Sequence, residues 1–383
     1  MDEKNYIYLD NNATTLLDPV VKKEMDKVFS LGPLNASSIH SQGRKASQML
    51  KQARKDIAAS LQVEEKEILF TSGATEAINL VLHSFLQKFP KGEILTSPIE
   101  HPAVLETLKQ QEAKVHYVAI DEKGDVTEER IKAALTPSIK LAIFSAVNTE
   151  TGVKNDLKML ARLAYQNGLF LILDGVGILG KAPFSIEEGI SAMVFSPHKV
   201  HGPQGTGILY AKKDFPLTAQ IKGGGQERNL RSGTENLAGI IGAAKAFCIA
   251  IEKSTAFEKK MEELRNLFET TLLTQLENVS VNGKGCRICN TSNLCFEGID
   301  GETLLILLDQ NGILASHGSA CASHALEPSK VLLEMKIPLE RVQSSLRFSL
   351  SRFTTKEEII KACEIITSLV TKLKTASFTY SAS

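Results

Sequence analysis

The 383-residue sequence has no apolar run close to the ~18 residues that a membrane span requires, and its first residues are polar. We therefore expect a cytosolic protein without a signal peptide. Lysines and arginines number 44, as do aspartates and glutamates, so the formal net charge is zero. Without a basic excess, the chain has no electrostatic reason to bind nucleic acid or an anionic membrane surface.

Cysteine is also scarce, with six residues in the whole chain. This number is too small for a disulfide scaffold in a protein of this length. Cys286 and Cys289 form one CxxC motif, but no second CxxC or HxxxH pair supplies further zinc ligands, so we expect no metal site. Nucleotide-binding motifs are missing too, because neither GxGxxG nor GxxxxGK[ST] opens a predicted helix.

From about residue 44, short apolar segments alternate with amphipathic helical patterns. Strands are predicted at residues 68–70, 94–96, 115–120, 139–145 and 169–173. This alternation predicts an α/β fold in which helices cover both faces of a mainly parallel sheet. Ligands of such folds gather at the carboxyl ends of the strands, so the residues that follow each strand are the candidates for function.

The pattern changes near residue 255, where a long amphipathic helix is expected to link two domains. Beyond it, shorter strands and helices indicate a smaller α+β domain. We expect three parts: an N-terminal segment (1–15) that joins the small domain, a large domain (16–255), and a small C-terminal domain (256–383) that carries a cysteine loop.

Lys199 lies in a Gly- and Pro-rich turn between two apolar segments, 192–195 and 207–210. A lysine held between core strands can be desolvated and made nucleophilic, whereas a lysine on a surface hairpin has no such role. Asp174 directly follows the apolar strand 169–173, where a carboxylate requires a cation or a polarised N–H as partner.

Residues 71–76 (TSGATE), which include Ala74 and Thr75, form a hydroxyl-bearing turn at a helix start. Such a turn can bind phosphate or simply cap the helix. A phosphate-binding turn, an aspartate at a strand end and a buried lysine are the parts needed to hold pyridoxal phosphate (PLP). The lysine would bond to the cofactor, and the aspartate would keep its pyridine nitrogen protonated.

Three other kinds of residue stand out. His101, at a predicted helix start, can stack on a ring, move protons or cap the helix. Cys321 lies among small residues, which leave its thiol accessible and favour chemistry over packing. Arg347 and Arg352 lie on a strand-like run, and either can bind a substrate carboxylate or form a structural ion pair.

Taken in order, these motifs resemble those of the cysteine desulfurases of the NifS/IscS type, which are class V aminotransferase-like PLP enzymes. The resemblance extends over essentially the whole chain. The motifs that carry it are YLDNNATT at 8–15, NASSIH at 35–40, TSGATE at 71–76, EH at 100–101, SPHK at 196–199, the glycine-rich stretch 223–234, SACAS at 319–323 and RFSLSRF at 347–353.

The resemblance implies a role for each candidate residue. Lys199 would hold PLP and abstract the Cα proton, Asp174 would pair with the pyridine nitrogen, and His101 would stack on the ring. The phosphate ligands would be Thr75, Ser196, His198 and, from the other subunit of a homodimer, Thr234.

The substrate implied by the resemblance is L-cysteine. Asn148 would lie beside cofactor and substrate, and Arg347 would bind the substrate carboxylate. Cys321 would attack the substrate sulfur as a thiolate, keep it as a persulfide and leave L-alanine. Family members pass this sulfur to iron–sulfur scaffolds or thiolation enzymes, so a sulfur-acceptor protein is the expected partner.

The sequence departs from the family pattern at three positions. Gly177 replaces a glutamine whose amide bonds to the phenolic oxygen of the cofactor. Pro197 replaces a small residue before the His-Lys pair, and His317 replaces a serine or threonine in the cysteine loop. Besides the desulfurase, two readings therefore stay open: a related PLP lyase or aminotransferase with an idle Cys321, and a catalytically weakened sulfur-relay partner.

Overall fold

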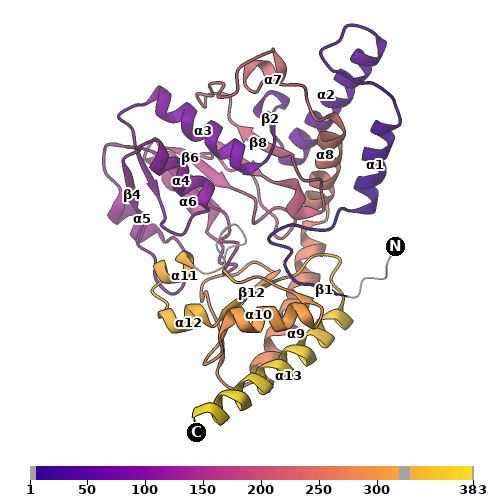
Figure 1. Cartoon of the computed structure of the whole chain (residues 1–383). Coiled ribbons are helices and arrows are strands. Elements are labelled where there is room, and N and C mark those ends of the chain that lie inside the picture. The colour runs from indigo at the N-terminus through magenta and orange to yellow at the C-terminus, as the bar shows by residue number, and fades with distance from the viewer. Residues whose placement is uncertain (1–5, 319–327, 382–383) are drawn as a thin grey trace.

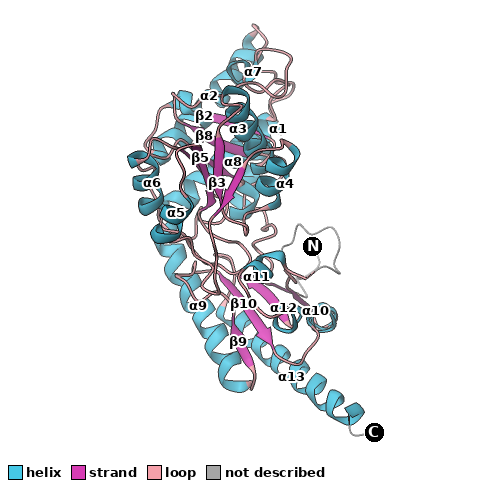
Figure 2. Ribbon diagram, turned by 90° about the vertical axis from the view of Figure 1, so that its left-hand side faces the viewer, coloured by secondary structure: helices cyan, strands magenta, loops and turns pink. Residues whose placement is uncertain are grey.

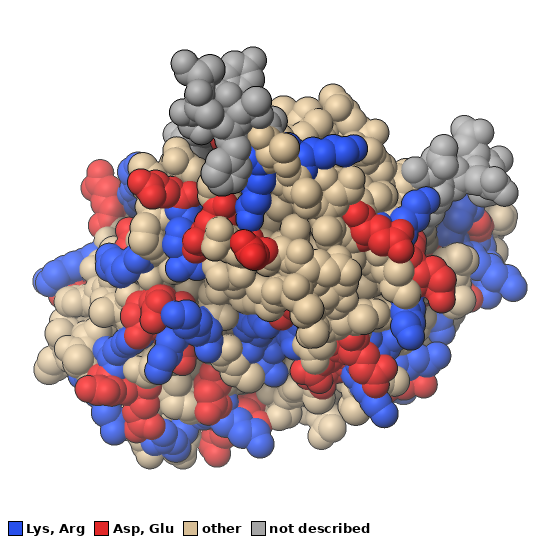
Figure 3. Space-filling model, turned by 90° about the horizontal axis from the view of Figure 1, so that it is seen from below, with Lys and Arg blue, Asp and Glu red and all other residues tan. Residues whose placement is uncertain are grey.

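The structure is a computed structural model of the whole chain, in which residues 6–318 and 328–381 are described. Figure 1 shows a larger body built around one sheet, with a smaller body below it. On the face seen in Figure 3, basic and acidic side chains are interspersed, in keeping with the zero formal net charge. No helix within the described residues is long and apolar enough to cross a membrane.

The larger body contains a seven-stranded sheet with the order β2-β8-β7-β6-β5-β3-β4. Strands β3 to β7 run parallel to one another, and β8 is antiparallel to both of its neighbours. This confirms the predicted α/β fold with a mainly parallel, mixed sheet. The strands are β2 (Ile68–Thr71), β3 (Glu93–Thr96), β4 (Val115–Tyr117), β5 (Ile139–Ser145), β6 (Phe170–Asp174), β7 (Ala192–Phe195) and β8 (Gly207–Ala211).

Helices bury both faces of this sheet. Along β6, the side chains of Leu171 and Leu173 join one apolar cluster, whereas Ile172 joins the cluster on the opposite face. Burial on both faces explains why this strand is a continuous apolar run in the sequence. The helices are α1 (Pro19–Phe29), α2 (Ser41–Leu61), α3 (Ala74–Lys88), α4 (Pro102–Gln110), α5 (Glu128–Ala134), α6 (Leu157–Gln166), α7 (Gln226–Asn229) and α8 (Leu237–Glu252), with the 3-10 turns η1 (Glu65–Glu67) and η2 (Pro197–Val200).

The smaller body has a three-stranded antiparallel sheet with the order β12-β10-β9, packed on helices around Phe268, Phe296 and Phe348. The predicted long amphipathic helix is α9, which descends from the larger body beside this sheet (Figure 2). The elements are α9 (Ser254–Gln275), β9 (Val279–Val281), β10 (Thr291–Phe296), α10 (Gly301–Gln310), β11 (Ile313–Leu314), α11 (Lys330–Glu334), α12 (Leu339–Gln343), β12 (Ser345–Ser349) and α13 (Lys356–Ser381).

The N-terminal segment also packs on the smaller body. Strand β1 (Ile7–Tyr8) pairs in parallel with β11, and Asp10 forms an isolated bridge with Ser349 of β12. The chain then crosses to the larger body, where Asp18 caps α1 by accepting a hydrogen bond from the Val20 N–H at 2.7 Å. Residues from the first fifteen positions therefore lie between the two bodies.

Candidate active site

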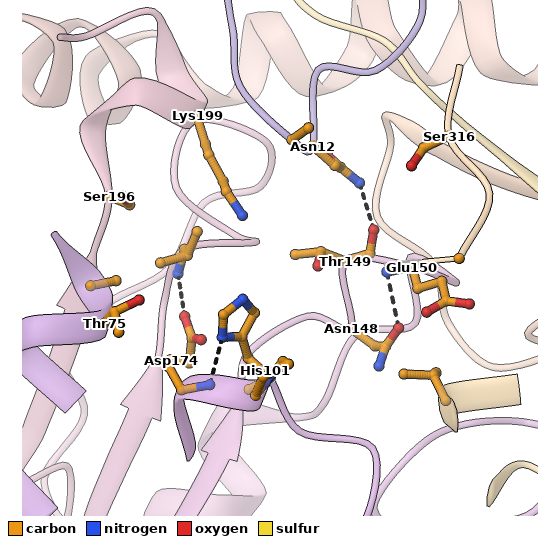
Figure 4. A pocket seen from close by; sticks show the side chains of 18 of the residues that line it. Asn12, Thr75, His101, Asn148, Thr149, Glu150, Asp174, Ser196, Lys199 and Ser316 are labelled. Atoms are coloured by element: carbon orange, nitrogen blue, oxygen red, sulfur yellow. Dashed lines mark hydrogen bonds between the residues drawn. The ribbon is translucent and has the colours of Figure 1, made fainter. Parts of the chain in front are cut away.

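A cavity of about 1180 Å³ lies where the carboxyl ends of the central strands face the smaller body (Figure 4). Its walls bring together most of the residues singled out in the sequence. Those that line it are Ala74, Thr75, His101, Asn148, Asp174, Ser196, His198, Lys199 and Arg347. Cys321 belongs to residues 319–327, outside the described part of the chain.

Lys199 is positioned by the η2 turn that follows β7. Pro197 occupies the start of this turn, where a missing backbone N–H costs no intrahelical hydrogen bond. The turn is fixed from outside because the His198 carbonyl accepts hydrogen bonds from the Thr15 N–H at 3.0 Å and hydroxyl at 2.7 Å. The Lys199 amine points into the cavity (Figure 4), as a lysine that reacts with a bound ligand must.

Asp174 is the last residue of β6 and is only 7% exposed. One of its carboxylate oxygens accepts a hydrogen bond from the Val176 N–H at 3.0 Å. A buried carboxylate with a cavity-facing side is a suitable partner for a protonated ring nitrogen.

The start of α3 provides a site for an anion. Its N-cap residue, Gly73, offers no side chain to cap the first N–H groups, and, apart from its chain neighbours, no described residue has an atom within 4 Å of where a Cβ would project. Gly207 allows this close packing, since a Cβ there would lie 2.5 Å from the Gly73 carbonyl carbon. The cavity wall beside this helix start carries the hydroxyls of Thr75 and Ser196, so the residues present fit a phosphate group.

Two histidines border the same cavity. His101 caps α4 by accepting the Ala103 N–H at Nδ1, at 3.0 Å, so this residue both caps a helix and lines the cavity. Burial, and then the nearby Lys199 and Lys181, lowers the pKa of His198 to about 4. His198 is therefore neutral near pH 7, and its Nδ1 lies 3.0 Å from the Thr14 hydroxyl.

The smaller body contributes Arg347, which is 2% exposed and lies on β12. Its Nη2 donates to an oxygen of Asp10 at 2.7 Å. The second candidate arginine, Arg352, instead pairs with Asp18 and contacts the Phe257 ring at 4.9 Å, away from the cavity wall. Of the two arginines, only Arg347 is placed to bind a ligand in this cavity.

Comparisons with known proteins identify the family to which this chain belongs. The aminotransferase class-V family matches residues 7–361. The chain belongs to this family. Its members use PLP, so the prediction of the cofactor is confirmed, and the lysine, aspartate and helix start described above fit that group.

Curated relatives of this class-V chain cover nearly its whole length. It is 39% identical to a cysteine desulfurase of Enterobacter agglomerans, across 97% of this chain and 94% of the relative. It is 38% identical to a cysteine desulfurase of Sinorhizobium fredii, across 96% and 97%. A solved NifS-like protein superposes with a TM-score of 0.90 at 35% identity, covering 96% of this chain and all of that one.

In the turn after Asp174 of this class-V enzyme, positions 175 and 177 are too tightly packed for side chains. A Cβ on Gly177 would lie 2.8 Å from the Val147 Cβ and 2.9 Å from the Val147 carbonyl oxygen. A Cβ on Gly175 would lie 2.6 Å from the side chains of Met193 and Phe195. The family has a glutamine where this chain has Gly177, and here the surrounding residues leave no room for it. The backbone must move to admit any side chain at position 177.

Asn148 lines the cavity, but its side chain also holds the turn that follows β5. Its Oδ1 accepts from the Glu150 and Thr151 N–H groups at 3.1 and 3.0 Å, and its Nδ2 donates to the Ile99 carbonyl at 3.1 Å. Asn148 thus fixes the loop that faces the smaller body, whatever it contacts in the cavity.

Thr234 does not line the main cavity of its own chain. It lines a smaller cavity of about 170 Å³ with Arg231, which pairs with Glu76. The two cavities share Ser72, Gly205 and Thr206 as lining residues, so they lie on two sides of the same wall.

Two buried charged residues near the cavity were missed in the sequence. Glu100 accepts hydrogen bonds from Ser97 and Ser145, and burial raises its pKa to about 7, helped by the charge of Asp174. Lys181 donates to Asn12 Oδ1 at 3.1 Å, and burial, then Lys199, lowers its pKa to about 7. Glu100 belongs to the EH motif at 100–101, but burial of a single glutamate or lysine cannot be read from the sequence because these residue types are mostly solvated.

The CxxC motif lies away from the cavity wall. Cys286 is exposed, whereas the buried Cys289 thiol donates to the Lys181 carbonyl at 3.0 Å. Burial raises the pKa of Cys289 to about 12, so this thiol is a packing residue. Within the described residues, no cluster of three or more His, Cys, Asp or Glu side chains is arranged to hold a metal ion.

Proposed function

We propose that this class-V enzyme is a cysteine desulfurase, which converts L-cysteine to L-alanine and holds the released sulfur as a persulfide on Cys321. One observation carries the proposal: a single cavity is lined by Lys199 and Asp174 of the larger body and by Arg347 of the smaller one. This set can hold PLP and an amino-acid carboxylate at once. The curated relatives that match the whole chain are named for the same activity.

Bound PLP supplies an electron sink that stabilises negative charge at the substrate Cα. Lys199 would hold the cofactor, and its Nζ would accept the Cα proton. Asp174 would pair with the protonated ring nitrogen, and the His101 imidazole would stack on the ring and help to move protons. Arg347 binds the substrate carboxylate, and Asn148 borders the substrate.

The phosphate would be bound by the start of α3 with Ala74 and Thr75, and by Ser196 and the neutral His198. In a homodimer, Thr234 of the partner subunit would complete this set. Its place on the far side of a shared cavity wall supports such an arrangement. The division into an N-terminal segment (1–15), a cofactor-binding domain (16–255) and a cysteine-loop domain (256–383) belongs to the same proposal.

Cys321 carries the sulfur. Its thiolate attacks the sulfur of the bound substrate, an S–S bond forms, and the substrate Cβ–S bond breaks. The electron pair of that bond remains with Cβ, which is then protonated, so the products are L-alanine and the Cys321 persulfide. This exchange balances without an external oxidant, and the persulfide can pass to an acceptor protein of iron–sulfur cluster assembly or of a thiolation pathway in the cytosol.

The test measures alanine and sulfide released from L-cysteine by the holoenzyme with a reducing thiol. Lys199→Ala should lose the visible absorbance of the lysine-bound cofactor and all alanine formation. Cys321→Ser should keep the absorbance but lose alanine formation. Cys286→Ser, which changes the exposed cysteine of the CxxC motif, is the matched control and should stay active. If Cys321→Ser still produces alanine, a lyase or aminotransferase with an idle Cys321 replaces the proposal.

A further inference from the structure

Arg347 is held from behind by a residue of the N-terminal segment. Asp10 accepts a hydrogen bond from Arg347 Nη2 at 2.7 Å, and it is not among the residues that line the cavity. We propose that Asp10 is a positioning residue for substrate recognition: it orients the Arg347 guanidinium so that the remaining N–H groups face the α-carboxylate of an amino acid. This inference rests on the proposed role of Arg347.

The backbone around Asp10 is bonded to the strand that carries Arg347. The Ser349 N–H donates to the Leu9 carbonyl at 2.6 Å, and the Asn11 N–H donates to the Ser349 carbonyl at 3.2 Å. The Ser349 hydroxyl also accepts the Asn12 N–H at 2.9 Å. Since Ser349 is two residues from Arg347 on β12, these bonds fix Asp10 relative to the arginine before any ligand binds.

The hydrogen bonds of Arg347 show which part of the guanidinium is left for a ligand. A guanidinium has five N–H donors in a rigid plane. Asp10 takes one at Nη2, and the Thr149 carbonyl is a longer contact of 3.5 Å from Nη1. The buried Nε has no hydrogen-bond partner within the described residues. An unpaired buried donor is unfavourable, and a carboxylate bound across Nε and one Nη satisfies it.

The other ionisable groups near Arg347 do not supply the negative charge that Asp10 supplies. Glu150 uses one oxygen to bond with Ser329, and burial raises the pKa of its carboxyl, which favours the neutral form. Burial, and then Asp10, raises the pKa of the Tyr8 phenol to about 12, so it is uncharged. The third neighbour, Lys181, has the same sign as the arginine. Among the described residues, Asp10 is the carboxylate that pairs with Arg347.

The test uses the holoenzyme and compares ligands with and without a carboxylate. Asp10→Ala should weaken the binding of L-alanine, followed by the absorbance of the bound cofactor, by about 10-fold to 100-fold. The KM for L-cysteine should rise similarly, with kcat within about twofold, because the lost interaction is present in both ground and transition states. Asp10→Asn keeps an acceptor oxygen but no charge, so its losses should be smaller.

Two aminooxy probes separate carboxylate recognition from general damage to the cofactor site. Aminooxyacetate carries a carboxylate and methoxyamine does not, although both react with the cofactor. Asp10→Ala should slow the reaction of the cofactor with aminooxyacetate but not its reaction with methoxyamine. The control is Asp18→Asn, which weakens the pair between the cap of α1 and Arg352 but keeps a capping side chain, and it should leave both rates unchanged.

An equal slowing of both probes by Asp10→Ala, or unchanged L-alanine binding, would overturn the inference. If Asp10→Ala does not fold, the Asp10→Asn variant decides in the same assay. Failure of the proposed function is a separate result. A wild-type enzyme that makes no alanine from cysteine, but binds L-alanine in an Asp10-dependent way, loses the desulfurase assignment and keeps the positioning role.

Discussion

Replacing Glu100 by glutamine should make the stability of this protein less sensitive to alkaline pH. Glu100 is 4% exposed, with Ser97 donating to one oxygen at 2.6 Å, and the Ser145 N–H to the other at 2.7 Å. These hydrogen bonds favour the carboxylate, but burial outweighs them and raises the pKa from 4.5 to about 7, with a further contribution from Asp174. The folded protein therefore prefers the neutral acid.

The raised pKa of Glu100 determines how the stability of the protein changes with pH. An acid whose pKa is raised on folding contributes stability that is fully present below pH 4.5 and is lost as the pH rises through about 7. At about 1.4 kcal/mol per pH unit, the loss amounts to about 3 kcal/mol. Glutamine has the same shape, accepts from Ser145, donates to Ser97 and does not ionise. The stability of Glu100→Gln relative to wild type should therefore rise with pH.

The assay is urea unfolding of the apoprotein at about pH 5 and about pH 8.5, followed by far-UV circular dichroism because the chain has no tryptophan. Glu128→Gln is the control. Hydrogen bonds from Lys132 and Arg162, which stay charged at both pH values, lower the pKa of Glu128, so its stability contribution changes only below pH 4.5. Its effect should be equal at both pH values. A pH-independent difference between Glu100→Gln and wild type would refute the reasoning.

Two further predictions concern packing and buried charge, both measured by the same unfolding assay. Gly177→Ala should lower the free energy of unfolding by about 1–3 kcal/mol, since its Cβ would meet Val147 at 2.8 Å. Gly225→Ala, whose Cβ would meet only an Asn229 oxygen at 3.4 Å, is the matched control, and equal losses would contradict the packing argument. Arg54→Met should cost about 3–5 kcal/mol because it leaves the Glu227 carboxylate buried without its cation, whose Nη2 lies 2.5 Å away. Adding Glu227→Gln should recover part of this loss, and no recovery would mean that the charge is not its cause.

Much of the cofactor side of the site could be predicted because it lies at strand ends. The apolar runs that form β6 and β7 can only be buried in a sheet covered on both faces, and the polar residues after them then share one edge. Lys199 and Asp174 are such residues, and both line the cavity. The composition of the 71–76 turn likewise indicated a helix start that can bind an anion.

The supporting roles of other residues could not be read from the sequence. Asp10 and Glu100 lie within motifs, but like Lys181 they are of types that are mostly solvated, and contacts with distant parts of the chain help to bury or pair each of them. The choice between Arg347 and Arg352 was also open, since both lie on one short run. Only tertiary packing separates them, because Asp10 of the N-terminal segment pairs with Arg347 and Asp18 at the start of α1 pairs with Arg352.

By itself, the sequence determined the α/β fold and the cofactor, and it predicted Lys199 as the residue that holds it, because hydrophobic periodicity and polar residues at strand ends are local properties of the chain. The tertiary structure decided what surrounds that lysine. It excluded a side chain at position 177 through contact with Val147, and it buried Glu100 beside Asp174. It also set Asp10 behind Arg347, 337 residues away along the chain. Such long-range contacts depend on how the two bodies pack, which no local pattern encodes.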